Sequence, residues 1–482
     1  MNYINQIFFC FLNKLKLCFF IFNISVGIFS QATPSFNHTF ISKTFFEMHP
    51  DLIPKRLSGK EISPYLVYNQ KFYFNSNLPN FENFDGLYIP KGYGYINGFL
   101  FTYNKKYFNL SFEPQLINQK VFEISPPDKK ELFSKLNDVP INQNNNFFLK
   151  NTGFKLFFKG ISAGYGNWNN WWGPGIHNSL TLSNNALGFY NYFIGTDDYI
   201  EVFDKIKYKI QYTVSNEMKN LNEISFFLTS LNLNIKFQSL EAGFSRNILS
   251  GGNRNFRWNI ENASKVIFTG ENLKYWDRYN DFYILYKDNN SGTYLFYELG
   301  IPNRHFNSSN QQKKFSENAM SSNIGLRKYG AFENDNIIYG IEYARLVQGI
   351  YYNIIPTPNW YDNIKYDYSS YRGRRWASHS GADSDDLLVY AGYINKKLLF
   401  IYGLNFERHG VTYHFPPEVK IEGKLSITYN FEFLSLQIMF ENEYYEHYGF
   451  VDDNNNVWNE TFERGSIQRT QTLLLQLESK IF

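Results

Sequence analysis

The sequence contains very little cysteine. Its two cysteines, Cys10 and Cys18, both lie within the first 32 residues, so the remaining chain has no thiol. This excludes a disulfide framework and thiolate chemistry beyond that segment. The net charge is only +3, which excludes a strongly basic surface that recruits nucleic acid. After residue 32 the chain also lacks any apolar run of about 18 residues, so it offers no transmembrane helix there.

Aromatic residues are abundant instead, at 20% of the chain with 49 Phe and 38 Tyr, while charged residues reach only 19%. Residues 1–32 resemble a secretory signal peptide, because Lys14 and Lys16 precede an apolar run at 17–29 and a small-residue cleavage site at 30–32. An uncleaved anchor is the alternative interpretation. An exported chain without spanning helices is either a soluble secreted β-protein or an outer-membrane β-barrel, whose alternating strands escape hydropathy searches.

Alternation of apolar and polar residues predicts β-strands along most of the chain. Residues 205–212 are apolar at even positions, and residues 337–344 are apolar at odd positions. Residues 425–433 alternate over their whole length. The apolar phase then flips at Phe433-Leu434, which predicts a bulge or a turn at that point.

Polar turn sequences separate such runs and predict hairpins at residues 103–106, 288–292 and 395–397. Aromatic residues recur at strand ends, as in the interfacial girdles of membrane barrels. They include Tyr93, Tyr95, Tyr208, Tyr212, Tyr283, Tyr286, Tyr297, Tyr390 and Tyr393. Glu298 and Glu342 lie within apolar strand segments, so in a barrel they would face the lumen and could meet the lysines of 205–209 there.

The expected fold is all-β, a transmembrane antiparallel β-barrel of about 16–18 strands, because a barrel strand with its connection takes roughly 25 residues. We assign residues 1–32 to the signal peptide, 33–89 to an N-terminal extension leading into the barrel, and 90–482 to the outer-membrane barrel. A short helix is expected at 126–136, and Asn-rich stretches predict long loops. The final strand ends at Phe482, like the C-terminal signal that barrel-assembly machinery reads.

The segment at 164–188 combines tryptophans with amides and a rigid turn. It contains Trp168, Trp171 and Trp172, the turn Gly173, Pro174 and Gly175, and a polar run that includes Asn178 and Asn184. Indole faces stack on the C–H faces of sugar rings, and amides hydrogen-bond sugar hydroxyls in both directions. This chemistry predicts a glycan-stacking site. The alternative is an aromatic plug that packs a structural turn against the barrel wall.

A second segment, residues 371–386, concentrates charge. Its candidate binding residues are Arg372, Arg374, Arg375, His379 and Asp383, with Asp385 close by. Arginine forks hold carboxylates bidentately, so the segment could bind an acidic sugar. The alternative is an internal network between the arginines and the aspartates. The histidine and aspartates also have metal-ligand chemistry, but the arginines oppose a cation, so we expect no metal.

No catalytic signature accompanies these segments. The sequence has no nucleophile elbow, no HExxH motif and no phosphate-binding loop. Asp383 and Asp385 are spaced like a glycosidase pair on an extended chain, but this spacing is common in surface loops. We therefore expect a protein that is not an enzyme and uses no cofactor.

Both segments resemble the capsule-assembly Wzi family of outer-membrane proteins. The residues that carry the resemblance are Asn170-Trp171-Trp172-Gly173-Pro174-Gly175, Asn178-Ser179-Leu180, Leu182-Ser183-Asn184-Asn185-Ala186, Gly188-Phe189, Gly243-Phe244-Ser245-Arg246, Gly251-Gly252, Tyr371-Arg372-Gly373-Arg374, His379, Gly381 and Asp383. The similarity extends from about residue 90 to the C-terminus. Ala377 and Ser378 depart from the pattern, at a place where a glycine is expected.

The resemblance implies an outer-membrane barrel of about 18 strands, closed by loops and helices. It also implies a lectin role, in which the protein binds and anchors or organises capsular or other surface polysaccharide. The partners would then be that polysaccharide and outer-membrane lipid. A passive outer-membrane channel for small solutes or oligosaccharides is the alternative function.

Overall fold

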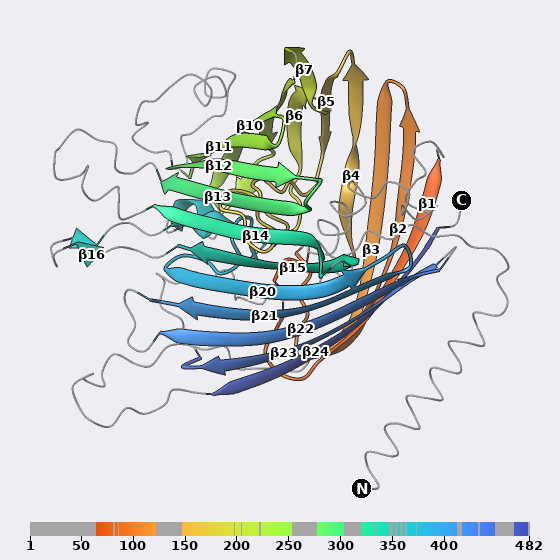
Figure 1. The fold of residues 1–482 in the computed structure, drawn as a ribbon, viewed down its shortest axis with the longest axis vertical. Coiled ribbons are helices and arrows are strands. Elements are labelled where there is room, and N and C mark those ends of the chain that lie inside the picture. Colours follow the sequence, from red (N-terminus) through yellow and green to blue (C-terminus); the bar gives the residue numbers. More distant parts are fainter. Residues whose placement is uncertain are drawn as a thin grey trace, which may run out of the picture.

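The computed structural model describes residues 64–121, 147–252, 277–302, 320–346, 364–411, 417–448 and 467–480, with 350–351, 355–356 and 360–361, apart from short gaps at 81, 85, 197, 204, 221–222, 333, 373 and 432–433. The predicted signal peptide, the predicted helix at 126–136 and the terminal Phe482 lie outside these residues. Their assignments therefore stay predictions. Figure 1 shows the described strands in the colours of the sequence.

The described elements are almost entirely strands. In chain order they are β1 (Tyr65–Asn75), β2 (Gly92–Lys105), β3 (Phe108–Val121), β4 (Phe147–Phe158), β5 (Ile161–Gly166), β6 (Asn191–Thr196), β7 (Ile200–Phe203), β8 (Ile206–Ser215), β9 (Met218–Lys219), β10 (Ser225–Phe237), β11 (Leu240–Gly251), β12 (Asp277–Asp288), β13 (Thr293–Pro302), β14 (Ser321–Ala331), β15 (Asn334–Arg345), β16 (Ile350–Tyr351), β17 (Ile355–Pro356), the 3-10 helix η5 (Ile364–Ser369), β18 (Ser370–Tyr371), β19 (Arg374–Arg375), β20 (Ser384–Ile394), β21 (Leu398–His409), β22 (Glu418–Asn430), β23 (Leu434–Glu446) and β24 (Gln468–Lys480). Among the described residues, no helix is long and apolar enough to cross a membrane.

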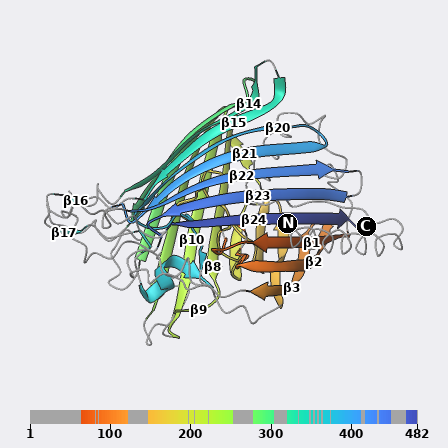
Figure 2. The ribbon, with the colours of Figure 1, turned by 90° about the horizontal axis from the view of Figure 1, so that it is seen from below.

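Eighteen of these strands form one closed antiparallel ring. Its order is β1, β2, β3, β4, β5, β6, β8, β10, β11, β12, β13, β14, β15, β20, β21, β22, β23 and β24, which returns to β1. The short strands β7 and β9 pair with β8 and β10. The prediction of an all-β antiparallel barrel of about 16–18 strands is therefore confirmed, and the tilted wall is visible in Figures 1 and 2.

The first strand of the ring lies before residue 90, where we expected the barrel to start. β1 pairs with β2 along its whole length and with β24 from Val67↔Lys480 to Asn75↔Thr472. Without β1 the ring would have two unpaired edges. The sequence concealed this strand because Leu66, Val67 and Tyr68 follow one another without a polar residue, which breaks the alternation that marks a barrel strand.

The two faces of the wall differ in chemistry, as the alternation predicted. On β21, for example, Phe400, Tyr402 and Leu404 are exposed on the outside, whereas Asn405 and Glu407 are buried on the inside. An apolar outer band is what a barrel presents to lipid, and a polar interior is what it encloses. The wall therefore has a lipid-facing surface and a hydrophilic lumen.

The two rims of the barrel also differ. At one rim tight turns join consecutive strands, as between β10 and β11 or between β20 and β21. Turns lie at the predicted positions 288–292 and 395–397. The hairpin predicted at 103–106 has its turn between Lys105 and Phe108. β22 ends at Asn430 and β23 begins at Leu434, where the change of apolar phase predicted a bulge or a turn. Longer connections leave the opposite rim, which we call the loop rim. In bacterial barrels short turns face the periplasm and long loops face outward.

Candidate functional site

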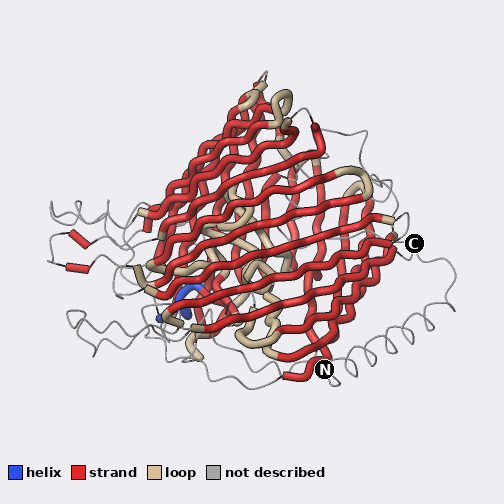
Figure 3. Tube along the Cα trace, turned by 60° about the horizontal axis from the view of Figure 1, so that its bottom comes forward, coloured by secondary structure: helices blue, strands red, loops and turns tan. Residues whose placement is uncertain are grey.

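Two segments from the loop rim fold into the lumen. We call residues 167–190, between β5 and β6, the first inner segment, and the described residues of 360–383, before β20, the second inner segment. Every residue at 174–188 and at 374–386 is buried. Figure 3 shows loop trace within the enclosure of the strands. The lumen therefore holds a plug made of these two segments.

A carboxylate on the wall holds the first inner segment. Glu342 on β15 accepts hydrogen bonds from the backbone N–H of Ile176 at 2.7 Å, of Asn178 at 2.7 Å, and of His177 at 3.2 Å. Glu298 on β13 accepts from the backbone N–H of Leu180 at 3.4 Å. Both carboxylates face the lumen, as predicted, but they bind the plug and not the lysines of 205–209. Among those lysines, Lys207 pairs with Glu201 on the surface.

The Gly-Pro-Gly turn fits tightly against this wall. Gly173 has φ +112, and a Cβ on it would lie 2.7 Å from Glu298 Oε1. A Cβ on Gly175 would collide with the carbonyl oxygen of Asn178. The carbonyl of Pro174 accepts a hydrogen bond from Arg327 Nη2 at 2.8 Å. The geometry of the turn is therefore set by backbone conformation and by close approach to the wall.

The three tryptophans occupy different environments. Trp172 is only 5% exposed and packs in the apolar core of the plug. Trp168 is half-buried; its Nε1–H donates to Ser111 Oγ at 3.0 Å, and its ring meets Phe193 edge to face. Trp171 is also half-buried, and its Nε1–H donates to the carbonyl of Gly175 at 2.9 Å. Of the three tryptophans, Trp168 and Trp171 are the partly exposed ones, and Lys155 Nζ lies over the Trp168 ring at 4.7 Å.

The two predicted asparagines hydrogen-bond within the plug. Asn178 Nδ2 donates to Asp386 Oδ2 at 2.8 Å, and Asn178 Oδ1 accepts from Ser378 Oγ at 2.5 Å. Asn184 Nδ2 donates to the carbonyl of Asn83 at 3.3 Å. Both asparagines are buried. They join the first inner segment to the wall, to the second inner segment and to the loop after β1.

The predicted arginines separate into one exposed and two buried residues. Arg374 lies over the ring of Tyr88 at 5.0 Å, and Arg375 lies over the ring of Tyr361 at 4.7 Å, both inside the barrel. Burial raises the pKa of Tyr88 to about 12, against the opposing effect of Arg374. Arg372 is exposed, with its guanidinium 5.6 Å from the centre of the Tyr371 ring.

The two aspartates of the expected internal network have different roles. Asp385 pairs with Arg408 on β21, through a 2.9 Å bond from Arg408 Nε, and not with the predicted arginines. Asp383 is fully buried with φ +51, and its carbonyl accepts the backbone N–H of Gly410 at 2.9 Å. It therefore shapes the chain at the entrance to β20.

His379 takes part in a cluster that the sequence did not reveal. Its Nε2 lies 3.1 Å from Asp386 Oδ2 and 3.5 Å from Glu407 Oε1, and its ring meets that of His177 at 4.4 Å. Burial alone would lower the pKa of His379, but hydrogen bonds to Asp386 and Glu407 raise it well above its usual value. In the sequence, only the position of His177 inside the tryptophan segment could have indicated this cluster.

Beside this cluster lies a buried ammonium surrounded by carboxylates. Lys420 Nζ pairs with Glu422 at 2.9 Å, with Glu443 at 3.3 Å and with Glu407 at 3.4 Å, and it also contacts Glu82. A buried charge is tolerated only when it is paired and hydrogen-bonded in this way. The cluster and the ammonium together bind the plug to strands β20 to β23.

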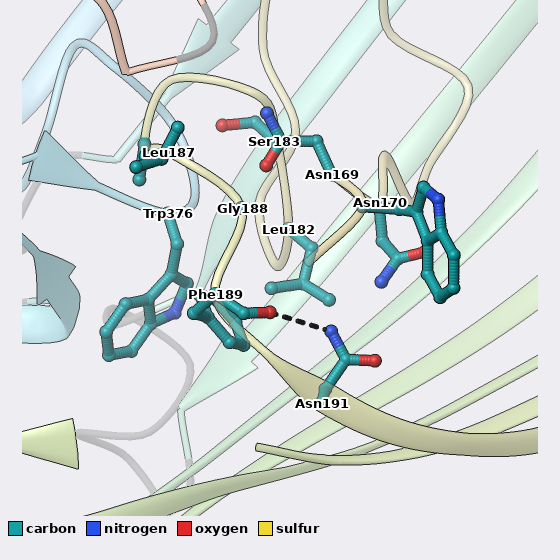
Figure 4. Close-up of a pocket in the computed structure, with 11 residues that line it drawn as sticks. Asn169, Asn170, Leu182, Ser183, Leu187, Gly188, Phe189, Asn191 and Trp376 are labelled. Carbon is teal, nitrogen blue, oxygen red and sulfur yellow. Dashed lines mark hydrogen bonds between the residues drawn. The ribbon is translucent and has the colours of Figure 1, made fainter. Parts of the chain in front are cut away.

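A narrow pocket opens beside the first inner segment (Figure 4). Its lining includes Trp168, Leu182 and Trp376, and Asn191 Nδ2 donates to the carbonyl of Phe189 at its edge, at 3.0 Å. The pocket has room for about one water molecule. Small-molecule sites typically enclose about 300 Å³ or more. A sugar ring therefore does not fit into this pocket in the present arrangement.

Comparison with known proteins finds a family match over part of the chain. Residues 76–294 match the family described as "Capsule assembly protein Wzi". No curated protein sequence matches the chain. Among solved structures the chain is similar to Wzi of Escherichia coli, described as an outer-membrane protein involved in group 1 capsule assembly and as a carbohydrate-binding β-barrel. The TM-score is 0.61, at 12% identity over 95% of each chain.

Two further structures are similar at lower scores. OccAB4 of Acinetobacter baumannii has a TM-score of 0.46 at 12% identity, over 88% of this chain and 100% of that chain. OpdK of Pseudomonas aeruginosa has a TM-score of 0.44 at 10% identity, over 87% of this chain and 98% of that chain. Scores below 0.5 indicate no more than a general similarity between barrels. Residues 76–294 match the capsule assembly Wzi family, and the chain forms a closed barrel with the fold of the Escherichia coli protein.

Proposed function

We propose that this protein binds a surface polysaccharide, such as a capsule, at the outer membrane and anchors or organises it there. The match of residues 76–294 to the Wzi family and the fold shared with a carbohydrate-binding barrel support this role. The protein acts by binding and assembly, not by catalysis. The long loops and the plug entrance share one rim, which faces outward by the rule for bacterial barrels.

The plugged lumen is the observation that carries the proposal. A passive channel needs a continuous aqueous path. Here residues 174–188 and 374–386 are buried within the barrel. Both inner segments are fixed to the wall by charged hydrogen bonds, such as those of Glu342 to the first segment and of Asp386 to His379. A closed barrel of this kind presents a surface for binding in place of a pore.

Arg372 is the candidate residue best placed to contact an acidic sugar. It is the exposed member of the predicted arginine set, and it lies beside Tyr371, whose ring meets Phe189 edge to face at 5.7 Å. An arginine next to an aromatic ring offers bidentate pairing with a carboxylate and a stacking surface for the sugar ring. The half-buried faces of Trp168 and Trp171 extend the proposed contact.

The remaining candidate residues are assigned a supporting role in the same proposal. They are Trp172, Asn178, Asn184, Arg374, Arg375, His379 and Asp383, all of them buried. Their hydrogen bonds and ring contacts run to other parts of the barrel and plug. We assign them the role of holding the plug in the conformation that exposes Arg372.

The first test removes the protein from the cell. Cells without it are expected to release their surface polysaccharide into the medium, and the intact protein supplied in trans should restore attachment. Purified protein in planar bilayers is expected to give no steady current. Full retention of polysaccharide by the deletion strain, or a steady open-pore current, would contradict the proposal.

The second test measures binding of purified, acidic surface polysaccharide to the folded protein. Arg372→Ala is expected to weaken binding roughly tenfold or more, because a charge-assisted hydrogen bond contributes about 1.5–3 kcal/mol. Lys207→Ala is a matched control, since Lys207 is also an exposed cation but pairs with Glu201. Equal binding by the wild type and by Arg372→Ala would remove Arg372 from the site and leave the anchoring role to the deletion experiment.

A further inference from the structure

Four buried side chains with metal-ligand chemistry meet inside the barrel: His177, His379, Asp386 and Glu407. His177 belongs to the first inner segment and His379 to the second, while Asp386 lies on β20 and Glu407 on β21. One ligand atom from each lies within 4.8 Å of all the others. Residues separated by nearly half the length of the chain are thus brought to one point.

We propose that these four side chains bind a divalent transition-metal ion of the zinc type, which fastens both inner segments to the barrel wall. A tetrahedral zinc ion has Zn–N and Zn–O bonds of about 2.0–2.2 Å, so its ligand atoms lie about 3.3–3.6 Å apart. The distances here are 3.3 Å from His177 Nε2 to Asp386 Oδ2, 3.1 Å from His379 Nε2 to Asp386 Oδ2, and 3.5 Å from His379 Nε2 to Glu407 Oε1. These three distances are close to the edges of a tetrahedral shell, and all four ligand atoms lie within 4.8 Å of one another.

The donor set selects the class of ion. Two imidazole nitrogens and two carboxylate oxygens suit zinc and its first-row neighbours, whereas magnesium and calcium prefer shells of oxygen alone. The charges of Asp386 and Glu407 would balance a divalent ion. All four ligands are protein side chains, which is the pattern of a structural site and not of a catalytic one with an open position.

The ligand carboxylates are held in position by neighbouring groups. Asn405 Nδ2 donates to Asp386 Oδ1 at 2.7 Å and also contacts His177 Nε2. Asp386 Oδ2 accepts from Asn178 Nδ2 at 2.8 Å and faces both histidines. Glu407 Oε2 lies 3.1 Å from His409 Nε2, so Glu407 Oε1 is the oxygen that faces His379. Hydrogen bonds of this kind orient the ligands of metal sites and increase their affinity.

The surrounding charge favours a cation. Within this part of the barrel the carboxylates of Glu82, Asp386, Glu407, Glu422 and Glu443 outnumber the nearby ammonium groups, which are those of Lys420 and, 3.8 Å from Glu422, Lys424. A second possible ligand group, formed by Glu82, Glu422 and Glu443, already holds the Lys420 ammonium. The histidine group differs, because this ammonium reaches it only through Glu407 Oε1, at 3.4 Å.

The arginines that argued against a metal in the sequence do not face this group in the contacts described above. Arg374 and Arg375 lie over the rings of Tyr88 and Tyr361. The sequence also suggested the wrong acidic partners, since Asp385 pairs with Arg408 and its neighbour Asp386 faces the histidines. The proposed metal site therefore differs from the one considered in the sequence, and the two have only His379 in common.

Zinc binding to the purified, full-length barrel tests the proposal directly and does not depend on polysaccharide. The folded protein is treated with a chelator, dialysed and titrated with zinc ions, and its metal content is measured by mass spectrometry. About one zinc ion per chain is expected, as for a four-ligand site. A wild-type protein that takes up no zinc at micromolar concentration would overturn the proposal.

Matched variants locate the ion. Glu407→Gln keeps the side-chain shape and removes one anionic ligand, so zinc affinity is expected to fall at least tenfold. Glu478→Gln is the control, because Glu478 is also a buried lumenal carboxylate but accepts hydrogen bonds from Asn69 and Gln476. Equal affinity of the wild type and Glu407→Gln, or an equal loss in both variants, would exclude the proposed ligand set.

A spectroscopic measurement on the wild type covers the case in which a variant fails to fold. Cobalt ions are substituted for zinc in the chelator-treated protein. A four-coordinate site gives intense visible absorption, and this is the expected result. The faint spectrum of six-coordinate, solvated cobalt would overturn the proposed geometry.

Discussion

Replacing Glu342 by glutamine tests whether one wall carboxylate holds the first inner segment. Each oxygen of Glu342 accepts one short bond, from Ile176 N–H to Oε2 and from Asn178 N–H to Oε1, both at 2.7 Å. In Glu342→Gln one of these oxygens becomes an NH₂ group, which cannot accept. One charge-assisted bond is lost and one backbone N–H is left without its acceptor in a buried site.

The structure sets the expected size of this effect. A hydrogen bond to a charged group contributes about 1.5–3 kcal/mol, and a buried donor left unsatisfied costs a similar amount. We therefore expect local opening of the segment to become easier by about 2–3 kcal/mol. Since about 1.4 kcal/mol corresponds to a tenfold change, amide exchange at Ile176, His177 and Asn178 should accelerate roughly 30- to 150-fold.

Hydrogen exchange followed by mass spectrometry on the folded barrel measures this change at constant pH and temperature. The control is again Glu478→Gln, which removes a buried lumenal charge that does not bind the plug backbone in the described contacts. Its exchange at 176–178 should equal that of the wild type. If Glu342→Gln folds and its amides at 176–178 exchange at the wild-type rate, the carboxylate does not hold the segment and the reasoning is refuted.

Three further substitutions test other parts of the plug and its support. Gly173 has φ +112, and a Cβ there would lie 2.7 Å from a wall carboxylate, so Gly173→Ala should lower the free energy of unfolding in denaturant by about 2–3 kcal/mol. Gly330→Ala is the control, at φ +78 with the nearest atom 3.5 Å from its Cβ, and should lower it by only about 1 kcal/mol. Equal losses of stability in both variants would argue against the close approach at Gly173. Trp172→Ala should cost about 3–5 kcal/mol through a cavity in the plug core, and a loss below about 1 kcal/mol in the same denaturant assay would show that the core is not packed around this ring. Lys420→Met should lower the free energy of unfolding by about 3–5 kcal/mol, because it leaves buried carboxylates uncompensated. Lys207→Met, on the surface, should stay within about 1 kcal/mol of the wild type. A similar loss of stability in both variants would contradict the role of burial.

Much of the barrel wall followed from alternation, because a strand between lipid and lumen must separate its two faces. The turn at Phe433-Leu434 and the lumenal position of Glu298 and Glu342 were predicted correctly on this basis. Alternation does not say which face is the inner one when both carry aromatic rings. Tyr283 and Tyr390 were assigned to an interfacial girdle, but both are buried, and Tyr283 Oη donates to Glu241 Oε1 at 2.7 Å.

The interior was harder to predict, since its contacts join segments that are far apart in the chain. The sequence indicated His379 as a candidate but not its partners. His177 precedes it by about two hundred residues, and Glu407 lies on β21, the second strand after it. The neighbouring aspartates show the same limit, because Asp385 and Asp386 point to different partners, as successive residues of a strand must.

The pairing of β1 with β24 is the longest-range pairing in the wall. Every other pair of wall strands joins segments that lie closer together in the chain. The β1–β24 pair aligns Val67 with Lys480 and closes the ring. Such long-range pairing is slow. A wall without this pair is an open sheet with two unpaired edges, so its formation is the step that encloses the inner segments.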